Sequence, residues 1–113
     1  MSKQQSVTVA LGDVAEGKMR SYTVQGREIV VCHTKQGIYA LDNICTHAYA
    51  RLDEGRLRGT RLICPLHGAS FDVRDGRALG APATRPLATH TVKVTGDRVD
   101  ISLTPAESQQ LTP

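Results

Sequence analysis

Short runs rich in β-branched residues fill the N-terminal part of the chain. They cover residues 6–11, 20–25, 28–33 and 37–41, and turn-forming stretches that contain Gly26 and Gly37 lie among them. Val, Ile, Thr and Tyr favour extended backbone, and short runs of this kind between turn residues are typical of strands. We therefore predict four strands here, joined as a meander.

The strongest local signal lies near the C-terminus. Residues 91–95 and 98–103 alternate polar and apolar side chains on either side of Gly96-Asp97, a pattern typical of a β-hairpin with a two-residue turn. Only residues 13–16 look helical, and because Gly12 and Gly17 bracket them we expect one helical turn at most. The pattern as a whole predicts an all-β fold.

The middle of the chain, residues 42–87, interrupts the alternation with repeated glycines and prolines. A long loop-rich segment inside a compact domain is usually functional, so we expect the chemistry to lie here. Residues 104–113 are polar, contain two prolines and show no alternation. They are expected to form a loose tail.

Length and charge restrict the class of protein. At 113 residues and 12.2 kDa the chain has the size of one domain. Its longest apolar run, Ile29–Cys32, is far too short to cross a membrane, and no signal-peptide pattern follows the first residues. The net charge of +3 is spread along the chain, which does not favour a nucleic-acid partner. We expect a cytoplasmic protein.

The cysteines point to a metal. Their number is three, which is odd, so a disulfide framework is not favoured. Two short motifs, which we call knuckles, each offer one thiolate and one imidazole: Cys45-Thr46-His47 and Cys64-Pro65-Leu66-His67. Common zinc sites instead pair two cysteines or two histidines at short spacings. Two mixed knuckles suit a two-iron centre, although a zinc knuckle or unligated side chains stay open as alternatives. Cys32 lies in an apolar run and is expected to be an inert buried thiol.

These knuckles, followed by Gly68 and the run Ser70-Phe71-Asp72-Val73, resemble the Rieske 2Fe-2S signature. In that family two histidines replace two cysteines on one iron. The resemblance implies one Rieske-type 2Fe-2S cluster with four ligands: Cys45 and Cys64 on the inner iron, His47 and His67 on the outer iron.

The chain from Val7 to about Leu103 resembles the small Rieske-type ferredoxins of bacterial aromatic-ring-hydroxylating dioxygenases. The resemblance implies a single domain over residues 1–113, folded as an antiparallel β-sandwich with a loop-built cluster-binding subdomain over residues 43–87. A proline-containing loop, residues 80–87, would cover the cluster.

The same resemblance implies the function. The chain would be a monomeric one-electron carrier, not an enzyme, that passes electrons from an NAD(P)H-dependent flavin reductase to a terminal Rieske non-haem iron oxygenase. The high-potential members of the family carry a disulfide and hydroxyl donors around the cluster. The matching positions here are Ala50, Leu66, Ala69 and Phe71. Because these side chains cannot stabilise the reduced state, we expect a reduction potential near the bottom of the Rieske range.

Two other functions compete with this one. The chain could be the small Rieske-like subunit of an assimilatory nitrite reductase, or a zinc-stapled structural module. Arg51 and Arg85 are candidates for steering acidic partners toward the cluster, unless Asp53 and Glu54 offset the nearby charge. His33 and His90 are expected to be ordinary surface or edge residues.

Overall fold

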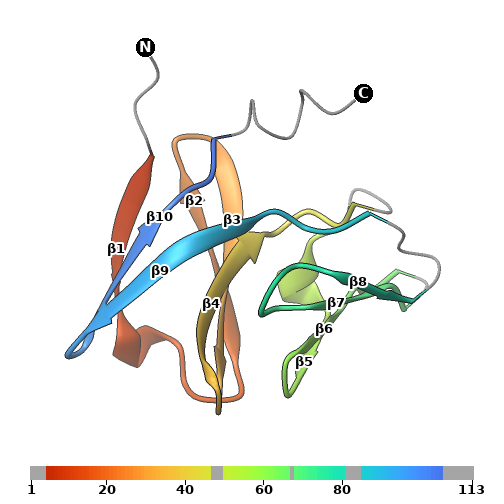
Figure 1. The fold of residues 1–113 in the computed structure, drawn as a ribbon, viewed down its shortest axis with the longest axis horizontal. Helices are drawn as coiled ribbons and strands as arrows, with labels where there is room; N and C mark the ends of the chain where they lie inside the picture. Colours follow the sequence, from red (N-terminus) through yellow and green to blue (C-terminus); the bar gives the residue numbers. More distant parts are fainter. Residues whose placement is uncertain (1–4, 47–49, 67, 81–84, 106–113) are drawn as a thin grey trace.

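The computed structural model describes residues 5–46, 50–66, 68–80 and 85–105, and within them the fold is two antiparallel sheets without an α-helix (Figure 1). The larger sheet has the order β1 (Ser6–Ala10), β10 (Arg98–Ser102), β9 (Thr89–Thr95), β4 (Gly37–Asp42), β3 (Arg27–Thr34) and β2 (Met19–Val24). The smaller sheet has the order β5 (Arg56–Arg58), β6 (Arg61–Ile63), β7 (Ser70–Asp72) and β8 (Ala78–Gly80). Two single 3₁₀ turns, η1 (Leu11–Asp13) and η2 (Leu52–Glu54), lie on the connections.

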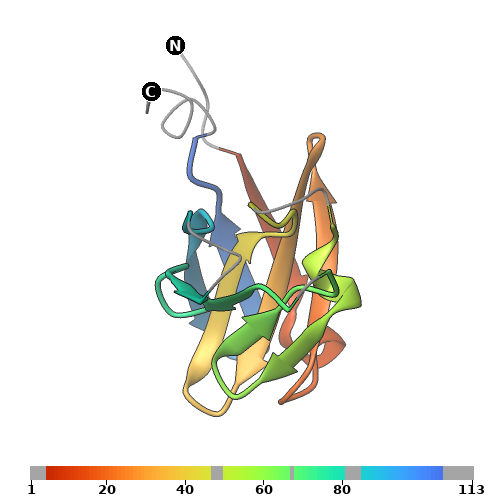
Figure 2. The same cartoon turned by 90° about the vertical axis from the view of Figure 1, so that its right-hand side faces the viewer.

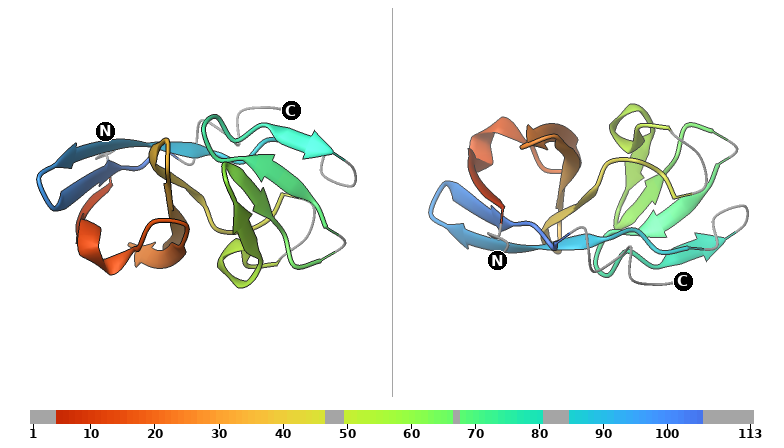
Figure 3. Two further views of the ribbon diagram at one scale, coloured as in Figure 1. Left: turned by 90° about the horizontal axis from the view of Figure 1, so that it is seen from below. Right: turned by 90° about the horizontal axis from the view of Figure 1, so that it is seen from above.

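The six-stranded sheet curls around its own apolar core. The end-on views of Figure 3 show β1 and β2 bending toward each other, so that the sheet resembles an open barrel. Its inner face carries eight buried apolar residues: Val14, Val24, Ile29, Val31, Ala40, Val99, Ile101 and Leu103. Because successive side chains on a strand point to opposite faces, alternate positions of each strand are enough to fill this core.

The strand β3 separates two cores. Ile29 and Val31 belong to the core of the curled sheet, whereas Val30 and Cys32 belong to a second core shared with the small sheet. Figure 2 shows the small sheet in front of the large one. This explains the unbroken apolar run in the sequence, since a strand covered on both faces needs apolar side chains at every position.

Most strand predictions are confirmed. All six predicted runs are strands, the β9–β10 hairpin turns at Gly96-Asp97, and β2, β3 and β4 form a meander. The placement of residues 6–11 in that meander is wrong, because β1 pairs with β10 at the far end of the sequence. The short helical turn lies at Leu11–Asp13 instead of residues 13–16.

The middle segment is more regular than a loop. It holds η2 and the four strands of the small sheet, each three residues long, and strands this short cannot display a recognisable alternation. Within the described ranges, no helix is long and apolar enough to span a membrane. The beginning of the expected tail is held in place, because the Thr104 N–H donates to His90 Nδ1 at 2.9 Å. Residues 106–113 lie outside the described part of the chain.

Candidate metal centre

Cys45 lies at the base of a closed turn between β4 and η2. Its backbone N–H donates to the carbonyl oxygen of Ala50 at 3.0 Å. The flanking residues Ile44 and Arg51 form an isolated antiparallel bridge. These contacts fix the two ends of the first loop, and the predicted ligand His47 lies outside the described residues.

Cys64 occupies the same position in a second loop, between β6 and β7. Its backbone N–H donates to the carbonyl oxygen of Ala69 at 2.7 Å. In both loops, therefore, the cysteine N–H bonds the carbonyl five residues later. Gly68 adopts a φ of 73°, which glycine accepts without strain. The predicted ligand His67 also lies outside the described residues.

The two loops bring the Cys45 and Cys64 thiols together. Both residues are buried, with exposed fractions of 4% and 2%, and neither forms a disulfide. Burial raises the pKa of the Cys64 thiol; the Leu66 N–H, 3.4 Å from its sulfur, opposes this, and the neighbouring Cys45 thiol raises the pKa further. Two adjacent buried thiolates need positive charge beside them, which fits a pair of iron ions.

The first loop is anchored by the fully buried Asn43. Its side-chain amide donates to Asp53 Oδ1 at 2.7 Å, and its Oδ1 accepts the Asp53 N–H at 2.9 Å. Burial raises the pKa of Asp53, but the Asn43 hydrogen bond and the Arg51 charge outweigh that effect, so its pKa is below the usual value. Sequence reasoning missed Asn43, and its only signal was a polar residue directly after a strand.

Two glycines allow the loops to pack closely. A Cβ built on Gly55 would lie 1.9 Å from the carbonyl oxygen of Ile63, next to Cys64. A Cβ on Gly76, in the β7–β8 connection, would lie 2.1 Å from the carbonyl oxygen of Leu87. The absence of a side chain at Gly76 thus lets the segment that follows the proline loop pack against the β7–β8 connection.

That segment also touches the first loop. The Thr46 hydroxyl donates to the carbonyl oxygen of Arg85 at 2.8 Å, and the Leu87 N–H donates to the carbonyl oxygen of Gly76 at 2.8 Å. Residues 81–84 of the predicted covering loop lie outside the described residues. The described end of that loop therefore connects the first cysteine loop to the small sheet.

The motif after the second loop has a structural explanation. Phe71 is fully buried in the same core as Cys45 and Cys64. Asp72 is 3% exposed and accepts hydrogen bonds from Arg74 at 2.7 and 3.0 Å and from Arg77 at 3.3 Å. The hydrogen bonds and charge of Arg74, followed by the charge of Arg77, lower the pKa of Asp72 to about 2 against an opposing effect of burial.

The steering role expected of Arg51 is not supported. Its guanidinium pairs with Glu28, with Asp53 at 3.3 Å and with Glu54 at 3.7 Å, so its charge is offset within the chain. Arg85 is exposed and keeps that role as a hypothesis.

The predictions for His90, His33 and Cys32 can each be compared with the structure. The surface expectation for His90 is wrong, because this residue is 7% exposed and its Nε2 bonds Asp42 Oδ1 at 2.9 Å. His33 is half-buried, with its Nδ1 2.7 Å from the carbonyl oxygen of Val14. Cys32 is confirmed as buried, and burial raises its pKa to about 12.

The structure thus defines an all-β protein of two antiparallel sheets, with two adjacent buried cysteines on loops of the same pattern. Residues 4–93 match the Rieske [2Fe-2S] domain family. The ferredoxin component of the naphthalene 1,2-dioxygenase system of Pseudomonas aeruginosa is 46% identical over 95 residues, which are 84% of this chain and 91% of that protein. The chain therefore belongs to the Rieske [2Fe-2S] family, and its cofactor is one 2Fe-2S cluster.

Solved structures agree with this assignment. One chain in a complex of reduced oxygenase and oxidized ferredoxin of carbazole 1,9a-dioxygenase matches with a TM-score of 0.81 at 32% identity, covering 88% of this chain and 94% of that chain. A structure described as the NADH-dependent nitrite reductase small subunit from Mycobacterium tuberculosis matches with a TM-score of 0.74, covering 93% of this chain and all of that chain, at 19% identity. The second match shows a shared fold alone. The chain is a Rieske ferredoxin, the electron-transfer component of a multicomponent dioxygenase.

Proposed function

We propose that this ferredoxin carries single electrons from an NAD(P)H-dependent flavin reductase to the Rieske centre of a terminal ring-hydroxylating oxygenase. The chain is the ferredoxin component of such a dioxygenase system and carries electrons to its oxygenase. The reductase, the monomeric state and the position of the docking surface are the finer parts of the proposal.

The observation that supports it best is the pair of twin loops that holds Cys45 and Cys64 side by side. When bound, a 2Fe-2S cluster accepts and releases one electron. Four side chains would hold it: Cys45, Cys64, His47 and His67. They lie within a cluster-binding subdomain that we assign to residues 43–87. Ala69 and Phe71 offer no hydroxyl near the second loop, which supports a reduction potential at the low end of the Rieske range.

The tip of the second loop is suited to brief docking. Leu66 is 45% exposed, and His67 follows it directly. Electron carriers use small, fast-exchanging interfaces, typically below about 1,200 Å². An exposed apolar side chain beside a ligand histidine suits such an interface, since it adds contact area without a charge that must lose its water on binding.

Spectroscopy and kinetics of the purified protein test the proposal. Electron paramagnetic resonance of the dithionite-reduced protein should report a 2Fe-2S cluster with mixed nitrogen and sulfur ligands. Stopped-flow mixing should then show oxidation of the reduced protein by a ring-hydroxylating oxygenase and reduction by a flavin reductase with NAD(P)H. A colourless, zinc-containing protein, or a reduced cluster that is not oxidised by the oxygenase of its own dioxygenase system, would refute the proposal.

The nitrite reductase subunit is the second candidate, and the shared fold alone supports it. Gel filtration separates the two functions, since a carrier should elute as a free monomer of about 12.2 kDa. Permanent association with a large catalytic subunit would favour the second candidate.

A further inference from the structure

The chain pairs five of its ten arginines with its own carboxylates and leaves other cations, Arg20, Lys35, Arg61, Arg85 and Lys93 among them, without a salt bridge to any described residue. Arginines that pair with carboxylates of the same chain are Arg27, Arg51, Arg74, Arg77 and Arg98. Lys18, just before β2, and Arg56 and Arg58 on β5 are exposed and form no salt bridge with any residue that the structure describes. These three cations are therefore available to a charge on another molecule.

What sets Lys18, Arg56 and Arg58 apart from the other unpaired cations is that all three line one hollow, of about 520 Å³, between the start of β2 and β5. Gly55 and Leu57 contribute to the same hollow, and none of the described lining residues is acidic. The strand β5 is the edge of the small sheet, so no further strand covers it on that side (Figure 1). We call Lys18, Arg56 and Arg58 the β5 basic face.

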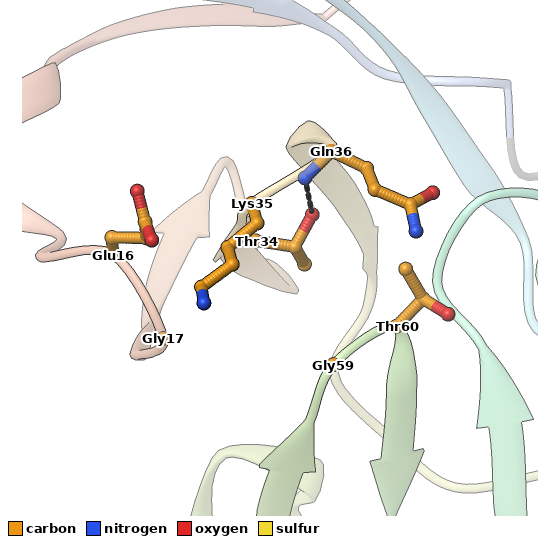
Figure 4. A pocket seen from close by; sticks show the side chains of 7 residues that line it. All are labelled: Glu16, Gly17, Thr34, Lys35, Gln36, Gly59 and Thr60. Carbon is orange, nitrogen blue, oxygen red and sulfur yellow. Dashed lines mark hydrogen bonds between the residues drawn. The ribbon is translucent and has the colours of Figure 1, made fainter.

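A neighbouring hollow differs in charge. It measures about 470 Å³ and is lined by both Glu16 and Lys35, with Thr34, Gln36 and Thr60 around it (Figure 4). The Gln36 N–H donates to Thr34 Oγ1 at 3.1 Å. Because one acidic and one basic side chain border it, this hollow does not select for anions. The β5 basic face has three cations and no lining carboxylate, so it favours the binding of anions.

One end of the β5 basic face borders the second cysteine loop, since Arg56 lies opposite Ile63 in the β5–β6 pair. Gly55, which lines the hollow, packs so closely on that loop that a Cβ there would lie 1.9 Å from the Ile63 carbonyl oxygen and 3.2 Å from Pro65 Cδ. Ile63 and Pro65 flank Cys64 in the chain. A molecule bound at this face would thus lie beside a loop that holds the cluster.

We propose that the β5 basic face is a docking surface for a redox partner protein that presents clustered carboxylates. This inference rests on the proposed function and adds the chemistry of the partner's surface. The guanidinium groups of Arg56 and Arg58 can each bind a carboxylate with two parallel hydrogen bonds. Charges at the rim of an interface mainly raise the association rate, which suits a carrier that must bind and release quickly. The face takes over the steering role that Arg51 cannot fill.

Titration of the cluster-containing protein with a hexaglutamate peptide at low salt tests the surface, with binding followed by NMR shifts of the Met19 and Leu57 amides. Arg56→Glu, Arg58→Glu and Lys18→Glu should each weaken peptide binding about fivefold, because each reversal removes an attraction and adds a repulsion. Lys93→Glu is the matched control, since Lys93 is exposed on β9. It should change the affinity less than about twofold.

Three results would overturn the proposal: no binding of hexaglutamate by the unaltered protein, binding by the three variants as tight as that by the unaltered protein, or binding of inorganic phosphate as tight as that of the peptide. The last would mean a small-anion site. Electron paramagnetic resonance of the same samples separates this proposal from the proposed function. If the cluster signal is intact and the peptide does not bind, only the docking surface fails, whereas a protein without the signal refutes the electron-carrier function whatever the peptide does.

Discussion

The two sheets of this ferredoxin are held together in different ways. The six-stranded sheet has strands of five to eight residues that bury a continuous apolar face. The small sheet has strands of three residues and depends on contacts with other segments. Leu62 and Phe71 are buried in the core shared with β3 and β4, and Asn43 and Gly55 fix its loops.

The large sheet thus owes its stability to a continuous apolar core, whereas the small sheet and its loops determine where the two cysteines lie. Apolar burial tolerates substitutions that conserve volume, because it is spread over many side chains. The cysteine loops depend on single hydrogen bonds and close approaches, where one added or removed atom shifts a ligand. Single substitutions in the small sheet should therefore affect cluster retention more than single substitutions in the large sheet.

The largest effect is expected from Cys64→Ser. This change removes one of the two thiolates that the twin loops bring together, so iron and acid-labile sulfide should fall to near zero. Far-ultraviolet circular dichroism should still report the strands of the six-stranded sheet, which has a core of its own. Cys45→Ser should behave in the same way.

Cys32→Ala is the matched control for the two cysteines that we propose as ligands, Cys45 and Cys64. Cys32 is as deeply buried as Cys64 but lies on β3. This variant should keep its iron, and its unfolding free energy should fall by about 1–2 kcal/mol because a small cavity is left. Iron loss in Cys32→Ala equal to that in Cys64→Ser, or full iron in Cys64→Ser, would contradict the ligand assignment.

The features predicted from sequence are the local ones. Runs of β-branched residues identify the four N-terminal strands, alternation identifies the two strands of the C-terminal hairpin, and the spacing around Cys45 and Cys64 identifies the cysteine pair. The pairing of β1 with β10 joins opposite ends of the chain and leaves no local signal. The close contact at Gly55 and the burial of His90 against Asp42, 48 residues away, depend on distant partners in the same way. His47 and His67 remain predictions from the motif.

Gly55→Ala should be the next most damaging change. The added methyl group would meet the Ile63 carbonyl oxygen, and backbone must move to make room. Overpacking of this kind costs about 1–3 kcal/mol, and here the displaced backbone leads into Cys64. We expect a lower iron content per protein and a lower melting temperature. Gly12→Ala is the control, because nothing lies within 4 Å of the Cβ position there, and it should change neither quantity measurably.

Asn43→Ala should have a smaller effect. The substitution breaks both hydrogen bonds between the Asn43 side chain and Asp53 and leaves a small buried space, at a cost of about 2 kcal/mol. Urea unfolding measures this loss. The cluster should also be lost faster in the presence of an iron chelator, since η2 then keeps only the backbone bond from the Leu52 N–H to the carbonyl oxygen of residue 43 at the start of the first loop. A rate of cluster loss equal to that of the unaltered protein would mean that the backbone bonds of this loop suffice.

The smallest effect is expected at Asp72 on β7, whose carboxylate pairs with Arg74 and Arg77. Its pKa in the folded protein is about 2, below the usual 3.8, so the unfolded chain takes up a proton first as the pH falls. The stabilisation is therefore complete above about pH 4 and is lost as the pH falls toward 2. Because Arg74 and Arg77 are half-exposed and screened by solvent, we expect about 1–2 kcal/mol.

Asp72→Asn isolates this contribution. The variant should be less stable than the unaltered protein by that amount at pH 7, and the difference in unfolding free energy should shrink toward zero near pH 2. The comparison cancels the acid sensitivity of the cluster, because both proteins carry the same ligand cysteines. Asp100→Asn is the counterpart in the large sheet, where Asp100 is half-buried and pairs with Arg98 at 3.5 Å. A pH-dependent difference as large for Asp100→Asn as for Asp72→Asn would mean that the polar contacts of the two sheets contribute equally.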